Sequence, residues 1–139
     1  GVRSVFDALV QWARDPGHGG RRPADDADVR TKLATFRVEI EVLQMLAFRN
    51  LGLLIRGEHP EHEASMVKIF STELMQRLQN AATKMLGLYG QLTPDDPLAP
   101  AEGRFERGYR AAVMPTFGAG ANEVMRNIIA TRGLGLPRQ

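Results

Sequence analysis

The fold is decided by two consecutive stretches, DDADVRTKLATFRVEIEVLQMLAFRNLGLLIRG (residues 25–57) and HEASMVKIFSTELMQRLQNAATKMLGLYG (residues 62–90). In both, apolar residues recur every three or four positions, which is the period of an amphipathic α-helix. The pattern therefore predicts two long helices joined by a short turn. The recurring residues are Val29, Leu33, Phe36, Ile40, Leu43, Ala47, Leu51 and Leu54 in the first stretch, and Ala64, Val67, Phe70, Leu74, Leu78, Ala81, Met85 and Leu88 in the second.

Local signals indicate where these two helices begin and end. Asp25 is a suitable N-cap for the first, because its carboxylate can accept hydrogen bonds from free backbone N–H groups. Gly57 is expected to end that helix, and Pro60 is expected in the first turn of the next.

Shorter helices are expected on both sides of the long pair. One covers residues 2–13, a weaker one covers 105–112, and the last covers 122–132 with Val124, Ile128 and Ile129 facing inward. Residues 93–103 are polar and rich in proline, which is typical of a surface loop. No stretch alternates as a strand would, so we expect an all-α, antiparallel four-helix bundle forming one domain over residues 1–139.

Composition excludes several functional classes. The 139 residues are 43% apolar and 24% charged with a net charge of +2, which fits one soluble globular domain. There is no cysteine, which excludes disulfides and fits a cytoplasmic protein. No apolar run approaches the ~20 residues of a membrane span, and no signal peptide is evident. Scattered basic residues with only 6% aromatics argue against nucleic-acid binding, and a start at Gly1 suggests a processed or truncated chain.

The histidines are not expected to bind a metal. His59 and His62 flank Pro60 in the run HPEHE, where exposure at a helix start favours a solvated cap over a metal site, and His18 stands apart. No nucleophile elbow, P-loop or dinucleotide-binding glycine pattern is present.

A glycine-rich turn, Gly118-Ala119-Gly120, leads directly into the last predicted helix at Asn122. Free N–H groups at a helix start can bind an anion or a phosphate, and glycine lets such a ligand come close. The same pattern also forms an ordinary turn and cap, so the residues alone leave both interpretations open.

Two segments carry a resemblance to a known family: residues 62–90 quoted above and YRAAVMPTFGAGANEVMRNIIATRGLGLPR (residues 109–138). They resemble the C-terminal helical domain of acyl-CoA dehydrogenases over nearly the whole chain. The resemblance implies a flavoenzyme whose FAD and acyl-CoA lie mostly on other domains. It also implies that this bundle mediates dimer or tetramer assembly and reaches the FAD of a neighbouring subunit. The 139 residues alone are expected to be colourless and inactive.

The resemblance also assigns candidate FAD contacts. Lys84, Leu86 and Gly87 match the family's Gln-x-x-Gly-Gly element, with Lys84 in place of Gln and Leu88 in place of the second Gly. Ala121, Asn122 and Glu123 match its Thr-Asn-Glu segment, with the Thr hydroxyl lost. Arg14 and Gly20 are the nearest remnants of an Arg-x-x-Phe-Gly element.

The catalytic base of many family members is missing from this chain. The Glu that removes the substrate α-proton aligns with Ala119, whose methyl group cannot accept a proton. Two interpretations follow from the resemblance. The base is placed upstream of Gly1, as in the isovaleryl-CoA dehydrogenase branch, or the chain is the base-less partner of a heteromeric enzyme like those that actinobacteria use on steroid side chains. The changes at Lys84, Leu88 and Ala121 favour the second.

A different functional class also fits the sequence. The chain could be an assembly module that binds no flavin, with its glycine turn only starting a helix.

Overall fold

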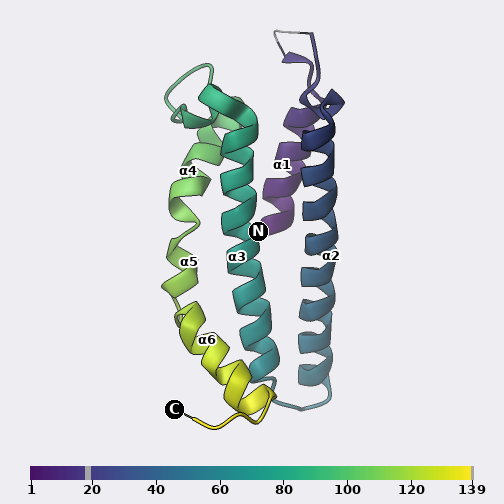
Figure 1. Cartoon of the computed structure of the whole chain (residues 1–139), viewed down its shortest axis with the longest axis vertical. Helices are drawn as coiled ribbons and strands as arrows, with labels where there is room; N and C mark the ends of the chain where they lie inside the picture. Colours follow the sequence, from purple (N-terminus) through teal and green to yellow (C-terminus); the bar gives the residue numbers. More distant parts are fainter. Residues whose placement is uncertain (18–19, 139) are drawn as a thin grey trace.

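The computed structural model describes residues 1–17 and 20–138, and all regular structure in them is helical. Four columns run alternately up and down, and three of them are single helices (Figure 1). This confirms the predicted all-α, antiparallel four-helix bundle. The single helices are α1 (Val2–Arg14), α2 (Ala27–Ile55) and α3 (His62–Leu86), and the fourth column consists of α4 (Arg104–Ala111), α5 (Met114–Phe117) and α6 (Asn122–Ile128).

The core surrounds α3, which packs against α1, against α2 and against each piece of the fourth column. Its residues Leu74 and Leu78 are fully buried, together with Leu9 from α1 and Phe105 from α4. Burying each such side chain contributes about 1.5–3 kcal/mol relative to leaving it exposed. The other buried members are Val5, Phe6, Phe36, Ile40, Ala82 and Leu86.

The predicted helix ends need two corrections. The N-cap of α2 is Asp26 and not Asp25, because the Asp26 side chain accepts hydrogen bonds from the N–H groups of Asp28 and Val29. Asp25 instead ends a short 3₁₀ turn, Pro23–Asp25. Pro60 is not in the first turn of α3, which begins two residues later at His62.

The fourth column differs most from the prediction. The short helix α5 was not expected, and α6 is shorter than predicted because it passes into one π-helical turn, Ile129–Gly133. Val124 was expected to face inward but is 52% exposed. Instead it is Asn122 that is buried, and it contacts Thr72 on α3.

None of the helices in the described part of the chain combines the length and the apolar character needed to cross a membrane.

Candidate functional site

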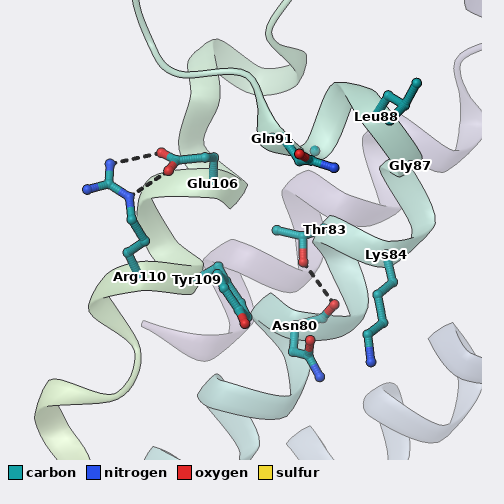
Figure 2. Close-up of a pocket in the computed structure, with 10 residues that line it drawn as sticks. Asn80, Thr83, Lys84, Gly87, Leu88, Gln91, Glu106, Tyr109 and Arg110 are labelled. Carbon is teal, nitrogen blue, oxygen red and sulfur yellow. Dashed lines mark hydrogen bonds and ion pairs between the residues drawn. The ribbon is translucent and has the colours of Figure 1, made fainter.

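A groove of about 720 Å³ lies where the C-terminal end of α3 meets α4 (Figure 2). One wall is α3, with Asn80, Thr83 and Lys84, and the opposite wall is α4. The groove is open to the surface, because Leu88 on its rim is 82% exposed. The remaining lining residues are Gly87, Gly90, Gln91, Glu106, Tyr109 and Arg110.

Charge on the α4 wall is already paired. Arg110 Nε and Nη2 donate to the two carboxylate oxygens of Glu106 at 2.5 and 3.0 Å, a bidentate pair one helical turn apart. The hydrogen bonds from Arg110 are the main cause that lowers the pKa of Glu106, and the same pair raises the pKa of Arg110. The other basic residue that lines the groove is Lys84 on α3. Its neighbours four residues away, Asn80 and Leu88, carry no charge, so Lys84 has no such carboxylate partner on its own helix.

The end of the groove is formed by the 3₁₀ turn Gly87–Gln91. Gly90 in this turn is buried, and a Cβ there would overlap the backbone carbonyl of Thr83. Only glycine lets the turn lie directly on α3 in this way.

The glycine turn of residues 118–120 is held against the N-terminal half of α3 by Lys68. The Lys68 Nζ donates to the Thr116 carbonyl at 3.2 Å, to the Gly120 carbonyl at 2.5 Å and to Asn122 Oδ1 at 2.6 Å. All three N–H bonds of the ammonium group are thus used. Within the turn, Ala119 has a left-handed φ of 53°, a conformation that costs a non-glycine residue about 1–2 kcal/mol.

Asn122 extends this network to the surface. Its Nδ2 donates to Glu73 Oε1 at 3.1 Å, and Arg126 Nη2 donates to the same oxygen at 2.6 Å. Burial opposes ionisation of the Glu73 carboxyl group, and it is the largest single influence on the pKa of that group. The hydrogen bonds from Arg126 and Asn122, with the charges of Arg126 and Arg77, together outweigh that burial and lower the pKa of Glu73.

The six predicted cofactor residues do not form one cluster. Lys84 and Gly87 line the groove, whereas the Leu86 side chain lies in the core with 6% exposure. Asn122 is only 3% exposed and its side chain is engaged by α3, while Ala121 is half-buried and Glu123 is exposed. Asn122 contacts Thr72, twelve residues before Lys84 on α3, so about 18 Å of helix separates the two sets.

The other residues singled out in the sequence lie elsewhere. Arg14 lines a second groove of about 730 Å³ between α1 and α2, together with Arg30 and Arg37. His62 Nε2 lies 3.1 Å from Glu63 Oε1 at the start of α3, and His18 lies outside the described residues. No cluster of three or more metal-ligating side chains occurs in residues 1–17 and 20–138.

Sequence reasoning missed two groups of residues. Asn80, Thr83 and Tyr109 line the groove, and helical spacing could have indicated the first two, because Asn80 lies one turn before Lys84 and Thr83 lies one turn before Gly87. The Lys68 network was also missed, since its acceptors are backbone carbonyls 48 and 52 positions away.

Comparison with known proteins identifies the family. The family model described as "Acyl-CoA dehydrogenase, C-terminal domain" matches residues 1–134. The chain is 38% identical over 133 residues to acyl-CoA dehydrogenase FadE26 of Mycobacterium tuberculosis, which covers 92% of this chain and 33% of that protein. It is 34% identical over 136 residues to acyl-CoA dehydrogenase FadE29 of the same organism, covering 97% of this chain and 34% of FadE29.

Solved structures agree with these matches. A chain of the ChsE4-ChsE5 complex from Mycobacterium tuberculosis superposes with a TM-score of 0.88 at 32% identity, over 99% of this chain and 36% of that one. A chain of the Tcur3481-Tcur3483 steroid ACAD gives a TM-score of 0.90 at 31% identity, over 99% and 35%. This chain thus spans about one third of the length of these relatives. It belongs to the acyl-CoA dehydrogenase family, and the part of the family that it matches is the C-terminal domain.

Proposed function

We propose that this chain is part of an FAD-dependent enzyme that oxidises the Cα–Cβ bond of an acyl-CoA thioester. Within that enzyme the bundle supplies contacts between subunits and contacts to an FAD held mostly by a neighbouring subunit. The observation that carries the proposal is that Lys84 and Gly87, which match the family's flavin-contacting element, line a surface groove. A cytoplasmic location stays a prediction from the lack of cysteine.

The groove has the donors that one part of a flavin nucleotide requires. FAD, when bound, supplies the acceptor for the hydride that leaves the substrate. Its diphosphate and ribose oxygens need hydrogen-bond donors, which the Lys84 ammonium and the Asn80 amide can provide. The ring of Tyr109, 51% exposed, offers a flat apolar face for a nucleobase. The residues therefore fit the nucleotide end of the cofactor.

The proton acceptor is proposed to lie outside this chain. Ala119 takes the place of the family's Glu and exposes only a methyl group to solvent. We favour a heteromeric enzyme in which a different subunit carries the base, because the similar structures named above are two-protein assemblies and one of them is a steroid ACAD. The substrate class is then the CoA thioester of a steroid side chain. The alternative remains a base upstream of Gly1 on the same polypeptide.

The test compares flavin retention in the intact assembly. The protein is purified as its gene encodes it, with its partner subunit if one is required, and flavin per subunit is measured by absorbance. Lys84→Ala should weaken retention about tenfold or more, because a charged hydrogen bond contributes about 1.5–3 kcal/mol. The matched control is Lys32→Ala, which removes an exposed lysine of α2 that does not line the groove.

The outcomes separate the two functional classes. Yellow wild-type protein with loss of flavin only in Lys84→Ala supports the enzyme subunit. Equal flavin content in both variants contradicts the assigned groove. A colourless assembly, with and without its partner, supports a helical module that serves assembly alone.

A further inference from the structure

The 139 residues contain three lysines, and the structure places their amines in three different settings. Lys68 uses all three N–H bonds of its ammonium group on the acceptors described above. Lys32 is exposed on α2 and lines neither of the two grooves described above. Lys84 is exposed and also lines the groove between α3 and α4. Of the three amines, it is therefore the one that a molecule in this groove can reach.

The amine of Lys84 is not held by another group. Its Nζ makes no hydrogen bond or ion pair with residues 1–17 or 20–138, and none is drawn to the other lining residues in Figure 2. The carboxylate of the groove, Glu106, is already engaged by both hydrogen bonds from Arg110. An electrophile that enters the groove thus meets a primary amine that can become a nucleophile by losing one proton.

A hydrogen-bond donor lies beside this amine. Asn80 precedes Lys84 by one helical turn, so both side chains project from the same side of α3, and both extend the same way in Figure 2. The hydrogen bond within α3 from Thr83 Oγ1, at 3.0 Å, uses only the backbone carbonyl of Asn80 and leaves its side-chain amide available. Attack on a carbonyl creates a negatively charged oxygen, which an amide N–H stabilises. The pair therefore suits acyl transfer to the amine.

We propose that Lys84 is a modification site that accepts an acyl group from a CoA thioester. The inference rests on the proposed function for its co-reactant, because an acyl-CoA dehydrogenase works in the presence of such thioesters. The neutral amine attacks the thioester carbonyl carbon, so that a C–N bond forms and the C–S bond breaks. The electron pair of the broken bond leaves on the CoA sulfur, and a proton passes from the amine to that thiolate. The products are an amide and free CoA, and no oxidant or reductant is needed.

Acylation changes what the groove can bind. It converts the Lys84 ammonium into a neutral amide and thereby removes the charge. The diphosphate of a flavin nucleotide then loses a charged hydrogen-bond donor. A bound nucleotide in turn covers the amine and protects it from the thioester. The two events exclude each other, so an excess of thioester over flavin should lower the flavin occupancy of the assembly.

The test is a labelling experiment on the unsubstituted protein, made as its gene encodes it and with its partner subunit if one is required. The probe is acetyl-CoA in mildly alkaline buffer, with free CoA as the control for binding without transfer. Peptide mass spectrometry then gives the rate of acetylation at each of the three lysines, in the presence and in the absence of added FAD. Lys32 is the matched exposed lysine.

The expected result is selective labelling. Lys84 should be acetylated about tenfold faster than Lys32, because a single donor to the developing oxyanion changes such rates by about 10²–10³ in enzymes and the open groove positions it less firmly. Lys68 should stay unmodified in the folded protein. Added FAD should slow the reaction at Lys84 and leave Lys32 unchanged. In protein unfolded by urea, all three lysines should react at similar rates.

Two variants separate the chemistry from the charge. Asn80→Ala should bring the rate at Lys84 down toward that of Lys32, since it removes the donor and keeps the amine. Lys84→Arg keeps a positive charge without a primary amine, so acetyl-CoA should no longer change its flavin content. In the unsubstituted protein, acetyl-CoA should lower flavin content as much as Lys84→Gln does, because both leave a neutral amide in the groove.

Equal rates at Lys84 and Lys32 in the folded protein, or no modification of Lys84 in either condition, would overturn the proposal. These readings need no variant, so they do not depend on whether a substituted chain folds. Selective acetylation of Lys84 that FAD does not slow, in an assembly without flavin, would contradict the proposed function and leave the modification site intact.

Discussion

The Lys68 ammonium lies in the N-terminal half of α3 and donates to oxygens of a segment about fifty positions later. Two of these acceptors are backbone carbonyls on either side of Ala119, so the lysine fixes the turn whose residue aligns with the family's base. A hydrophobic residue in its place would remove this donor from both carbonyls and would leave Asn122 Oδ1 with the longer hydrogen bond from Thr72 Oγ1, at 3.4 Å.

Replacing Lys68 tests how much the turn depends on this contact. Lys68→Met keeps the length and apolar stem of the side chain and removes its donors, so we expect a loss of about 1–3 kcal/mol in the free energy of unfolding. Amide hydrogen exchange should rise across residues 116–126 before it rises in α1. The control Lys32→Met, at an exposed position, should stay within about 0.5 kcal/mol of wild type. Equal losses in both variants would show that the network contributes nothing specific.

Glu73 gives the network a dependence on pH. Its pKa in the folded protein is lowered from 4.5, so the charged carboxylate stabilises the fold above that value. This contribution should disappear as the pH falls from about 5 through the lowered folded pKa. The free-energy difference between wild type and Glu73→Gln should therefore shrink on acidification, as measured by urea unfolding at a series of pH values. The same change at exposed Glu123 reports the general cost of losing one carboxylate. A Glu73 difference that stays constant from pH 6 to 3 would contradict the assignment.

At the scale of elements, the sequence predicts the long helices well and their connections poorly. The three-and-four periodicity locates α2 and α3 because many residues carry the same signal. The start of α3 is wrong by two residues, since Pro60 is compatible both with the first turn of a helix and with the loop before it. The helix α5 has four residues, which is too short to show a period.

The groove depends on one of these connections. Gly90→Ala should push the Gly87–Gln91 turn away from α3, because the new methyl group would overlap the Thr83 carbonyl. Overpacking of this kind costs about 1–3 kcal/mol. We expect a lower thermal midpoint together with weaker flavin retention in the assembly. The matched control is Gly52→Ala, where φ is not positive and the new methyl group would have no neighbour nearer than 3.7 Å, so a methyl group is added without overlap. An unaltered thermal midpoint in Gly90→Ala would show that the turn is not in contact with α3.

At the scale of the whole molecule, the candidate site was predictable only in part. Resemblance led to Lys84 and Gly87, which the fold places in the groove, but it grouped them with Asn122, which contacts the N-terminal half of α3 about 18 Å away along that helix. Spacing along a chain cannot show that a polar residue at a helix start will face inward, because that depends on what lies opposite it. Here the Lys68 donor lies opposite Asn122, on another helix.

The long sequence separation between Lys68 and Asn122 affects how the chain folds during its synthesis. Helices α2 and α3 are connected by six residues, so they can pair as soon as α3 has left the ribosome. Lys68 then remains a solvated cation on the surface of an unfinished bundle until Asn122 has also been made. Docking of the last column should therefore be a late step. A ribosome stalled shortly before residue 122 would carry a chain with its hydrophobic hairpin formed and its polar centre still in water.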